Sequence, residues 1–192
     1  MATIRRVHNS PFELTDRRRV SFYAAVYNSP AVVFDYGPDH KTRIKYREVI
    51  PQGAFAKALT SSPEIVADID HDESRTFART SDGSLMIQSD PHGLYCTCWV
   101  PETAEGDAIL RDIKDGKLTG CSFHALYTPE AQVWRTGGDM PECTVTEMYQ
   151  LVDVCLTGNP AYEDTDVLVR TKTINKGKAQ AELFRFRKLY QG

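Results

Sequence analysis

The stretch LTGCSFHALY (residues 118–127) has the apolar and aromatic composition of a buried β-strand, yet Gly120, Cys121 and Ser122 interrupt it. Alternation along an extended strand would place Gly120, Ser122 and His124 on one face. Small residues beside a serine leave room for a second backbone, such as a substrate peptide, to approach. Ser122 is therefore either an ordinary strand serine or a nucleophile, and other parts of the chain bear on the choice.

Alternating apolar residues and turn signals recur along the chain and predict a mainly β fold with flanking helices. We expect strands at 20–34 (two, with a turn at 28–30), 44–50, 64–72, 81–101 (two), 118–128, 133–134 and 144–160. Helical spacing predicts helices over 51–63 and 102–117, the second capped by Thr103 and ended by Gly116. Strands joined by turns favour a closed, mostly antiparallel β-barrel of about seven strands.

The domain organisation follows from where this pattern begins and ends. Residues 1–19 are polar and basic and predict an N-terminal arm, 20–170 hold the one folded domain, and 171–192 predict a basic tail. The arm lacks the apolar segment of a secretory signal, so synthesis in a cytoplasm is the expectation. No run approaches ~18 apolar residues, which argues against a membrane span.

Charge and cysteine content exclude further classes. The formal net charge of −3 gives no overall basic excess that would indicate specific nucleic-acid binding. The five cysteines are an odd number in a chain without a secretory signal, which argues against a disulfide framework. His92, Cys96 and Cys98 suggest a zinc module as one alternative, but alternation in 93–100 favours buried thiols in a strand, so no metal is expected.

A serine nucleophile needs a histidine base, and the chain has five histidines. His8, His40 and His92 lie in polar or turn segments and are expected to be solvated. His71 ends the strand at 64–72, and strict alternation would place it on the face of Ile65, Ala67 and Ile69, toward the core. A partly buried histidine there suits a general base; a core histidine bonded to backbone and a metal ligand among the acids of DIDHDE are the alternatives.

Two carboxylates on the later strand could orient that histidine. Asp153 interrupts the apolar run LVDVCL, where a carboxylate is costly unless it is paired, and a histidine Nδ1–H is a natural partner. The alternative is an edge-strand acid that reaches solvent. Glu147 is the second candidate for the same role.

Four blocks in this order resemble the caudovirus prohead maturation proteases, serine peptidases related in fold to the herpesvirus assembly protease. The blocks are REVIPQGAFAKAL (47–59), VADIDHDES (66–74), DPHGLYCTCWVPETAEGDAILRDIKDGKLTGCSF (90–123) and LVDVCLTGNPAY (151–162), and the resemblance runs from about residue 20 to about 170. It implies His71 as the base, Ser122 as the nucleophile and Asp153 where the family has a glutamate or a second histidine. His124 stands where many members have glycine.

The resemblance also implies a function and its setting. It implies a serine endopeptidase without a cofactor that cleaves scaffold or capsid precursor, and itself, inside the viral procapsid in the host cytoplasm. The herpesvirus relatives act as dimers, which implies a homodimer. It does not assign the oxyanion-stabilising group, for which backbone N–H groups are the expectation. The changed residues at 124 and 153 keep one rival open: a catalytically inactive scaffold or capsid component with the same fold.

Overall fold

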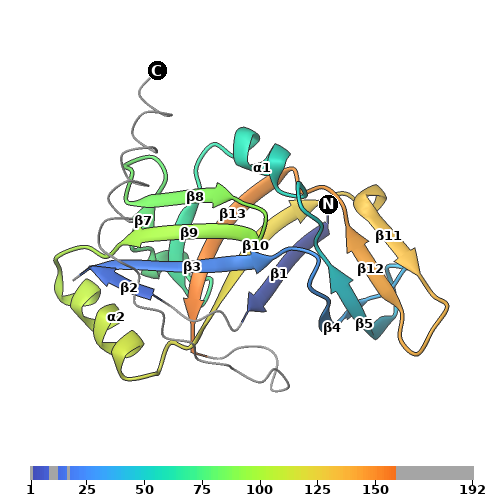
Figure 1. Cartoon of the computed structure of the whole chain (residues 1–192), viewed down its shortest axis with the longest axis horizontal. Coiled ribbons are helices and arrows are strands. Elements are labelled where there is room, and N and C mark those ends of the chain that lie inside the picture. Colours follow the sequence, from blue (N-terminus) through green and yellow to red (C-terminus); the bar gives the residue numbers. More distant parts are fainter. Residues whose placement is uncertain (1, 9–12, 17, 159–192) are drawn as a thin grey trace.

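The computed structural model describes residues 2–8, 13–16 and 18–158, with side chains from residue 18 onward, and consists mostly of strands in three sheets (Figure 1). The central sheet has the order β1-β10-β13-β6-β7. Its strands are β1 (Ala2–His8), β10 (Gly120–Tyr127), β13 (Gln150–Thr157), β6 (Val66–Ile69) and β7 (Ala78–Arg79). Neighbours in this sheet are antiparallel except β13 and β6, which run parallel. The three central strands contain or adjoin the expected site residues.

Two four-stranded sheets flank this one. The first, in the order β2-β3-β9-β8, is antiparallel and contains β2 (Glu13–Asp16), β3 (Arg19–Val26), β9 (Gly93–Trp99) and β8 (Leu85–Ser89). The second, in the order β11-β12-β5-β4, contains β11 (Gln132–Arg135), β12 (Glu142–Val145), β5 (Arg43–Val49) and β4 (Ala31–Tyr36), with β12 and β5 parallel. Strand β3 contacts β1 and β10, so the first flanking sheet packs on the central sheet (Figure 1).

The prediction of a closed barrel is wrong, because all three sheets are open. Each sheet ends in two unlinked edge strands: β1 and β7, β2 and β8, or β11 and β4. Closure needs the last strand of a sheet to pair with the first. Alternation along the sequence locates a strand but does not specify its neighbours. The described residues also form thirteen strands rather than about seven, since strands as short as β7 leave too few residues for alternation to be visible.

The two expected helices are confirmed. Helix α1 spans Ala56–Ser61 and helix α2 spans Ala104–Lys114, and two single 3-10 turns lie at Glu73–Arg75 and Pro129–Ala131. The Thr103 hydroxyl accepts the Gly106 N–H at 3.1 Å, which satisfies one of the free donors of the first turn of α2. Among the described residues, no helix combines the length and the apolar composition needed to cross a membrane.

The long strand expected over 144–160 is instead two strands in different sheets. Strand β12 ends at Val145 in the flanking sheet, and β13 begins at Gln150 in the central sheet. Between them the Met148 N–H donates to the Ala54 carbonyl at 2.7 Å, and the Met148 side chain is fully buried. The apolar residues of this segment belong to the two strands and to the buried Met148 between them, a pattern that the sequence does not distinguish from a continuous strand.

The N-terminal residues contribute backbone to the fold. Strand β1 pairs antiparallel with β10 and places Val7 opposite Ser122, and β2 pairs with β3. Both strands lie within the stretch 1–19 that the sequence suggests is a polar arm. The basic tail expected over 171–192 lies outside the described residues.

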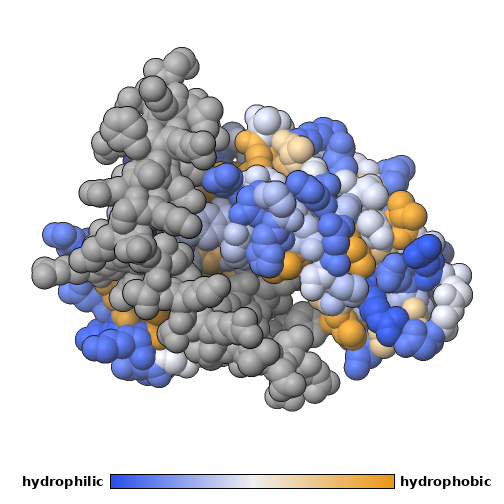
Figure 2. Space-filling model, viewed as in Figure 1, coloured by the Kyte–Doolittle hydropathy of each residue, from blue (hydrophilic) through white to orange (hydrophobic). Residues whose placement is uncertain are grey.

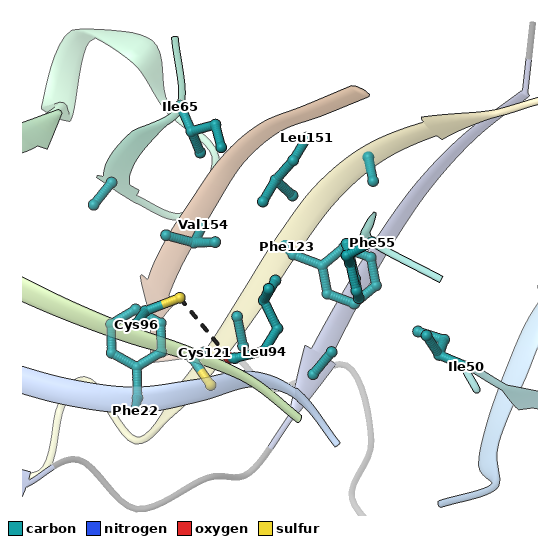
Figure 3. Packing of buried hydrophobic residues seen from close by; sticks show 14 of the residues in the cluster. Phe22, Ile50, Phe55, Ile65, Leu94, Cys96, Cys121, Phe123, Leu151 and Val154 are labelled. Carbon is teal, nitrogen blue, oxygen red and sulfur yellow. Dashed lines mark hydrogen bonds between the residues drawn. The ribbon is translucent and has the colours of Figure 1, made fainter. Parts of the chain in front are cut away.

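One hydrophobic core lies between the sheets (Figure 3). Phe22 and Leu94 from the first flanking sheet meet Phe123 and Val154 from the central sheet, and Phe55 from the start of α1 joins them. All five cysteines are free thiols buried within the structure. Cys96 and Cys98 are core residues whose thiol pKa values are raised by burial, so they pack as small apolar side chains.

Phe123→Ala should lower the free energy of unfolding by about 3–5 kcal/mol, because the phenyl ring is fully buried and the sheets cannot close the cavity completely. The ring also makes an edge-to-face contact with Phe55 at 5.1 Å between centroids, which the alanine would lose. Urea denaturation followed by circular dichroism measures the change. Phe34→Ala is the matched control, since Phe34 is a strand phenylalanine with 61% of its surface exposed and should change stability by less than about 1 kcal/mol. Equal losses in the two variants would contradict this description of the core.

Candidate active site

Ser122 lies near the middle of the central sheet, on the face opposite the phenylalanine core. Its backbone on β10 is paired with Val7 of β1 on one side and Cys155 of β13 on the other. Because side chains alternate, Ser122 and His124 share one face while Phe123 between them enters the core. Ser122 has no exposed surface, so its hydroxyl needs a hydrogen-bond partner inside the protein.

Asp153 lies on the neighbouring strand β13, directly opposite His124. A register irregularity lies between His124 and Ala125, after which the pairing continues with Ala125 opposite Leu151. Asp153 as a residue is only 5% exposed, so its carboxylate in this apolar strand needs partners, as its position in the sequence predicts. The alternative of a solvent-exposed edge acid is wrong for this residue, since β13 lies inside the sheet between β10 and β6.

His71 reaches the same face through a tight turn that follows β6. Asp70 and His71 both have a φ of 59°, and the Asp72 N–H donates to the Ile69 carbonyl at 3.1 Å. Positive φ at both central positions is typical of type I′ turns, which usually contain glycine or asparagine there. The expectation that His71 continues the alternation of Ile65, Ala67 and Ile69 is therefore wrong: those three are core residues, whereas the turn redirects His71 to the other face.

The backbone of this turn is held at several points. The His71 N–H donates to Asp68 Oδ1 at 3.0 Å, and the Asp70 N–H donates to the Leu156 carbonyl at 3.0 Å. The Thr157 hydroxyl donates to Asp70 Oδ1 at 2.6 Å. These bonds from β6 and β13 offset the cost of a left-handed backbone at two residues that have a Cβ.

A continuous chain of hydrogen bonds joins the three side chains. His71 Nδ1 lies 2.6 Å from Asp153 Oδ1, and His71 Nε2 lies 2.9 Å from Ser122 Oγ. An ionised carboxylate can only accept, so Nδ1 of the imidazole carries the hydrogen, and the Nε2 of a neutral ring accepts from the Ser122 hydroxyl. The structure thus brings together the three residues that the sequence analysis selects, from three separate segments of the chain.

His124 is a second partner of the same carboxylate. Its Nδ1 lies 3.3 Å from Asp153 Oδ2, and its ring stands perpendicular to that of His71 at 6.2 Å between centroids. Burial acts to raise the pKa of Asp153, but the hydrogen bonds from His124 and His71 outweigh it and hold the pKa below its ordinary value. Asp153 is therefore an anion at neutral pH with both oxygens bound.

Asp68 is a buried carboxyl beside this group that the sequence analysis does not select. Strict alternation assigns Asp68 and His71 to opposite faces, and the turn after β6 brings them to the same one. Asp68 Oδ2 is buried without a hydrogen-bond partner among the described residues. Burial raises the pKa of Asp68 to about 7, and the negative charge of Asp153 adds to the rise. Asp68 interrupts the apolar run IVADI (65–69) as Asp153 interrupts LVDVCL, and that is the sequence signal that could have selected it.

Asp68→Asn should become more stable relative to the wild type as the pH rises, because the wild type loses stability and the variant does not. A pKa raised to about 7 means that the folded state holds the proton more tightly than the unfolded chain. The stabilisation is complete below pH ~4, the ordinary range for aspartate, and is lost as the pH rises through about 7. Asparagine does not ionise, so its advantage over the wild type should grow by a few kcal/mol between pH ~4 and 8.

Urea denaturation of the wild type and the variant at a series of pH values measures this difference. Asp82→Asn is the control, because hydrogen bonds from Ser84 hold the pKa of that exposed carboxyl below its ordinary value. The ionised Asp82 side chain therefore stabilises the wild type at neutral pH. This contribution is lost as the pH falls, the opposite direction to the loss expected for Asp68. A difference between wild type and Asp68→Asn that stays constant from pH 4 to 8 would contradict the buried acid described here.

The remaining candidates lie apart from this group. Glu147 is exposed in the link between β12 and β13 and accepts from Lys57 Nζ at 2.8 Å, so it is not the partner of His71. His40 is exposed in a loop, and His92 lies in an exposed turn with its ring edge-to-face on Tyr23. His8 belongs to a strand whose side chains lie outside the described part of the structure.

His92, Cys96 and Cys98, the suggested zinc module, do not appear together as potential metal ligands in the described part of the structure. Within the described residues, the one group of three whose donor atoms all lie within 4.8 Å of one another is Asp68, His71 and Cys155. Both nitrogens of His71 already serve Asp153 and Ser122. An ion at that place would therefore have to break one of those two hydrogen bonds.

A comparison with protein families agrees with the geometry. The model described as caudovirus prohead serine protease matches residues 7–180, a wider range than the four motifs alone indicate. Comparisons with curated proteins and with solved structures gave no match. The match covers most of the chain, including every strand that bears a member of the hydrogen-bonded group, and the chain therefore belongs to the caudovirus prohead serine protease family.

Proposed function

We propose that this protein is a serine endopeptidase in which Ser122 is the nucleophile, His71 the general base and Asp153 the residue that orients the base. The observation that carries the proposal is the unbroken path from the Asp153 carboxylate through the His71 ring to the Ser122 hydroxyl, at 2.6 and 2.9 Å. Both distances are within hydrogen-bond reach without any movement of the side chains. Membership of the prohead protease family supports the same reaction class.

The hydrogen-bond distances support the following path for each proton of the proposed reaction. Ser122 Oγ attacks the carbonyl carbon of the scissile peptide bond while its proton passes to His71 Nε2. Asp153, which accepts from Nδ1, stabilises the imidazolium that forms. When the tetrahedral intermediate collapses, the imidazolium gives the proton to the leaving amine and the acyl group remains on Ser122. Water then attacks the acyl-enzyme with His71 again as base and releases the acid product.

The surroundings of the three side chains favour this chemistry. Side chains of His71 and Asp153 are 11% and 8% exposed, so their interaction is little weakened by water. The second bond to Asp153, from His124, fixes the carboxylate that is one methylene shorter than the glutamate of the family pattern. Because Ser122 has no exposed surface, a substrate must displace the groups that cover it before attack.

Family membership implies association with capsid precursor proteins inside the procapsid of a phage-infected cell. We propose that the substrates are the scaffold protein, a scaffold-like segment of the capsid precursor and the enzyme itself. Removal of such internal protein would free volume for the genome. The rival, an inactive assembly component with the same fold, accounts for the family match but gives no reason for three buried polar side chains to be joined by hydrogen bonds.

Co-expression of the protein with the capsid and scaffold precursors tests the function. The precursor bands should disappear with the wild type and persist with Ser122→Ala. Ser21→Ala is the matched control, since Ser21 is a buried strand serine bonded to Thr97 at 3.1 Å, in the first flanking sheet. Processing should continue with that control. Precursors that survive equally with wild type and Ser122→Ala would favour the inactive assembly component.

A further inference from the structure

One face of the flanking sheet β11-β12-β5-β4 carries large exposed hydrophobic side chains, whereas the solvent-exposed face of a sheet is usually polar. All three large hydrophobic side chains that are exposed among the described residues belong to it: Phe34 at 61%, Tyr36 at 52% and Val133 at 52%. Figure 1 shows this sheet at one end of the molecule, away from α2, and in the same view hydrophobic residues lie among hydrophilic ones at that end (Figure 2).

Alternation along the strands defines which residues share this face. Val33 and Tyr46 point to the buried side, where the Tyr46 ring meets Trp134 at 4.8 Å between centroids. The register pairs Phe34 with Lys45 and Tyr36 with Arg43, so those four side chains lie on the opposite side. The aromatic-basic face is our name for the outward residues Phe34, Tyr36, Arg43, Lys45, Val133 and Arg135. The register places Arg47 and Glu142 on the same side of the sheet.

The cations on the aromatic-basic face are poorly neutralised. Arg43 and Lys45 are exposed and have no carboxylate partner within the part of the chain that the structure describes. Arg135 has a side chain that is 78% exposed and lies 3.8 Å from Glu142, a long ion pair that contributes little. The whole chain carries a formal net charge of −3, so this positive charge is a local feature and not a consequence of composition.

The position of Arg43 indicates which kind of anion fits. Its guanidinium lies over the Phe34 ring at 5.1 Å and within 6.0 Å of the Tyr36 ring, and one of its nitrogens donates to the Phe34 carbonyl at 3.2 Å. The guanidinium covers part of these rings, and Phe34 and Tyr36 remain 61% and 52% exposed, so aromatic surface is left for apolar side chains of a partner. The remaining guanidinium donors suit a carboxylate, and the ring edges and Val133 suit apolar side chains.

We propose that the aromatic-basic face binds an extended acidic segment, interspersed with apolar residues, of a protein partner. Charge complementarity with Arg43, Lys45 and Arg135 selects acidic side chains, and Phe34, Tyr36 and Val133 take the apolar ones. This face belongs to a different sheet from Ser122, so a partner bound there does not occupy the place of the catalytic group. The proposal goes beyond the peptidase reaction and does not depend on it.

Fluorescence anisotropy with labelled peptides tests this face. The Ser122→Ala protein is used so that cleavage does not disturb the measurement, and the probe is a 16-residue peptide in which glutamates are interspersed with leucines. Reversal of two charges, Arg43→Glu with Lys45→Glu, should weaken binding at low salt by about 10-fold or more. The matched control, Arg111→Glu with Lys114→Glu on α2, reverses one exposed arginine and one exposed lysine elsewhere and should change binding less than about 2-fold.

Three results would overturn the proposal. Equal binding by the charge-reversed variant and the control places the peptide elsewhere. Tighter binding of a single-stranded 16-nucleotide DNA than of the acidic peptide identifies a nucleic-acid surface. A dimer in sedimentation that dissociates in Phe34→Ser identifies the face as a contact between two copies of the chain. None of these results bears on whether Ser122 cleaves peptides, so the two proposals can fail separately.

Discussion

Ser122→Ala is expected to lower kcat/KM for a peptide spanning a precursor cleavage site by about 10⁴–10⁶-fold. The alanine removes the hydroxyl that is proposed to form the acyl bond, and the His71 ring then has no proton to accept from residue 122. Any remaining rate would come from polarisation of the bound carbonyl, which lowers the barrier without a nucleophile. Steady-state cleavage of a fluorogenic peptide, with enzyme in excess for the variant, measures the loss.

Folding and catalysis can be separated for this substitution. Loss of one buried hydrogen bond costs about 1 kcal/mol, so the thermal midpoint of Ser122→Ala should stay close to that of the wild type. Ser21→Ala removes a similar buried bond, to Thr97, and should retain activity within about 2-fold. Comparable activity in wild type and Ser122→Ala, with both folded, would exclude Ser122 as the nucleophile.

Asp153→Asn is expected to lower kcat by about 10³–10⁴-fold while the substrate KM changes little. An asparagine amide placed at 2.6 Å from His71 Nδ1 can donate to that nitrogen, which would move the ring hydrogen to Nε2. The ring could then no longer accept the Ser122 proton, and the imidazolium would have no adjacent negative charge. Activity is measured from pH 5 to 9. If the base is lost, activity stays low at every pH, whereas if only its protonation has shifted, activity recovers at a different pH.

Glu147→Gln is the matched control for Asp153→Asn, because it makes the same chemical change in the other candidate acid. Glu147 is exposed and paired with Lys57, so its loss should leave kcat within about 2-fold. The opposite pattern, a large loss in Glu147→Gln and a small one in Asp153→Asn, would show that His71 is oriented by a different carboxylate in the working enzyme.

The sequence predicts which residues of the candidate site lie together better than it predicts how the strands are arranged into sheets. Ser122 and Asp153 stand out because each is a polar residue inside an apolar run, and the motifs around them place His71 in the same group. Their actual proximity depends on β10 and β13 being antiparallel neighbours and on β6 joining β13 in parallel. Those pairings connect residues far apart in sequence, which local alternation does not encode.

Two errors at the site have a common physical cause. Alternation assumes an extended backbone, and it fails where Asp70 and His71 adopt positive φ. The turn reverses the expected face of His71, and it brings the unselected carboxyl of Asp68 next to the His71 backbone. A non-glycine turn of this kind is held by tertiary hydrogen bonds such as that from Thr157, and so it leaves no glycine or asparagine by which a sequence would reveal it.

The prediction of a closed barrel fails for a related reason, because local alternation does not encode which strands pair. Individual strands at β3, β4, β5, β8, β9 and β10 lie where alternation and turn residues place them. The segment after residue 144 divides at Met148 between two sheets, and no apolar pattern marks that division. The strand positions therefore follow from local sequence, whereas the number of sheets follows from packing around one core.

Covalent labelling with a fluorophosphonate tests the central claim, that Ser122 is a nucleophile activated by His71. The wild type should take up one label per chain, mapped by mass spectrometry of the digested protein to the peptide that contains Ser122. His71→Ala should slow labelling by at least about 10²-fold, and Ser122→Ala should abolish it. Label on a different residue, or equal labelling of the wild type and Ser122→Ala, would contradict the account.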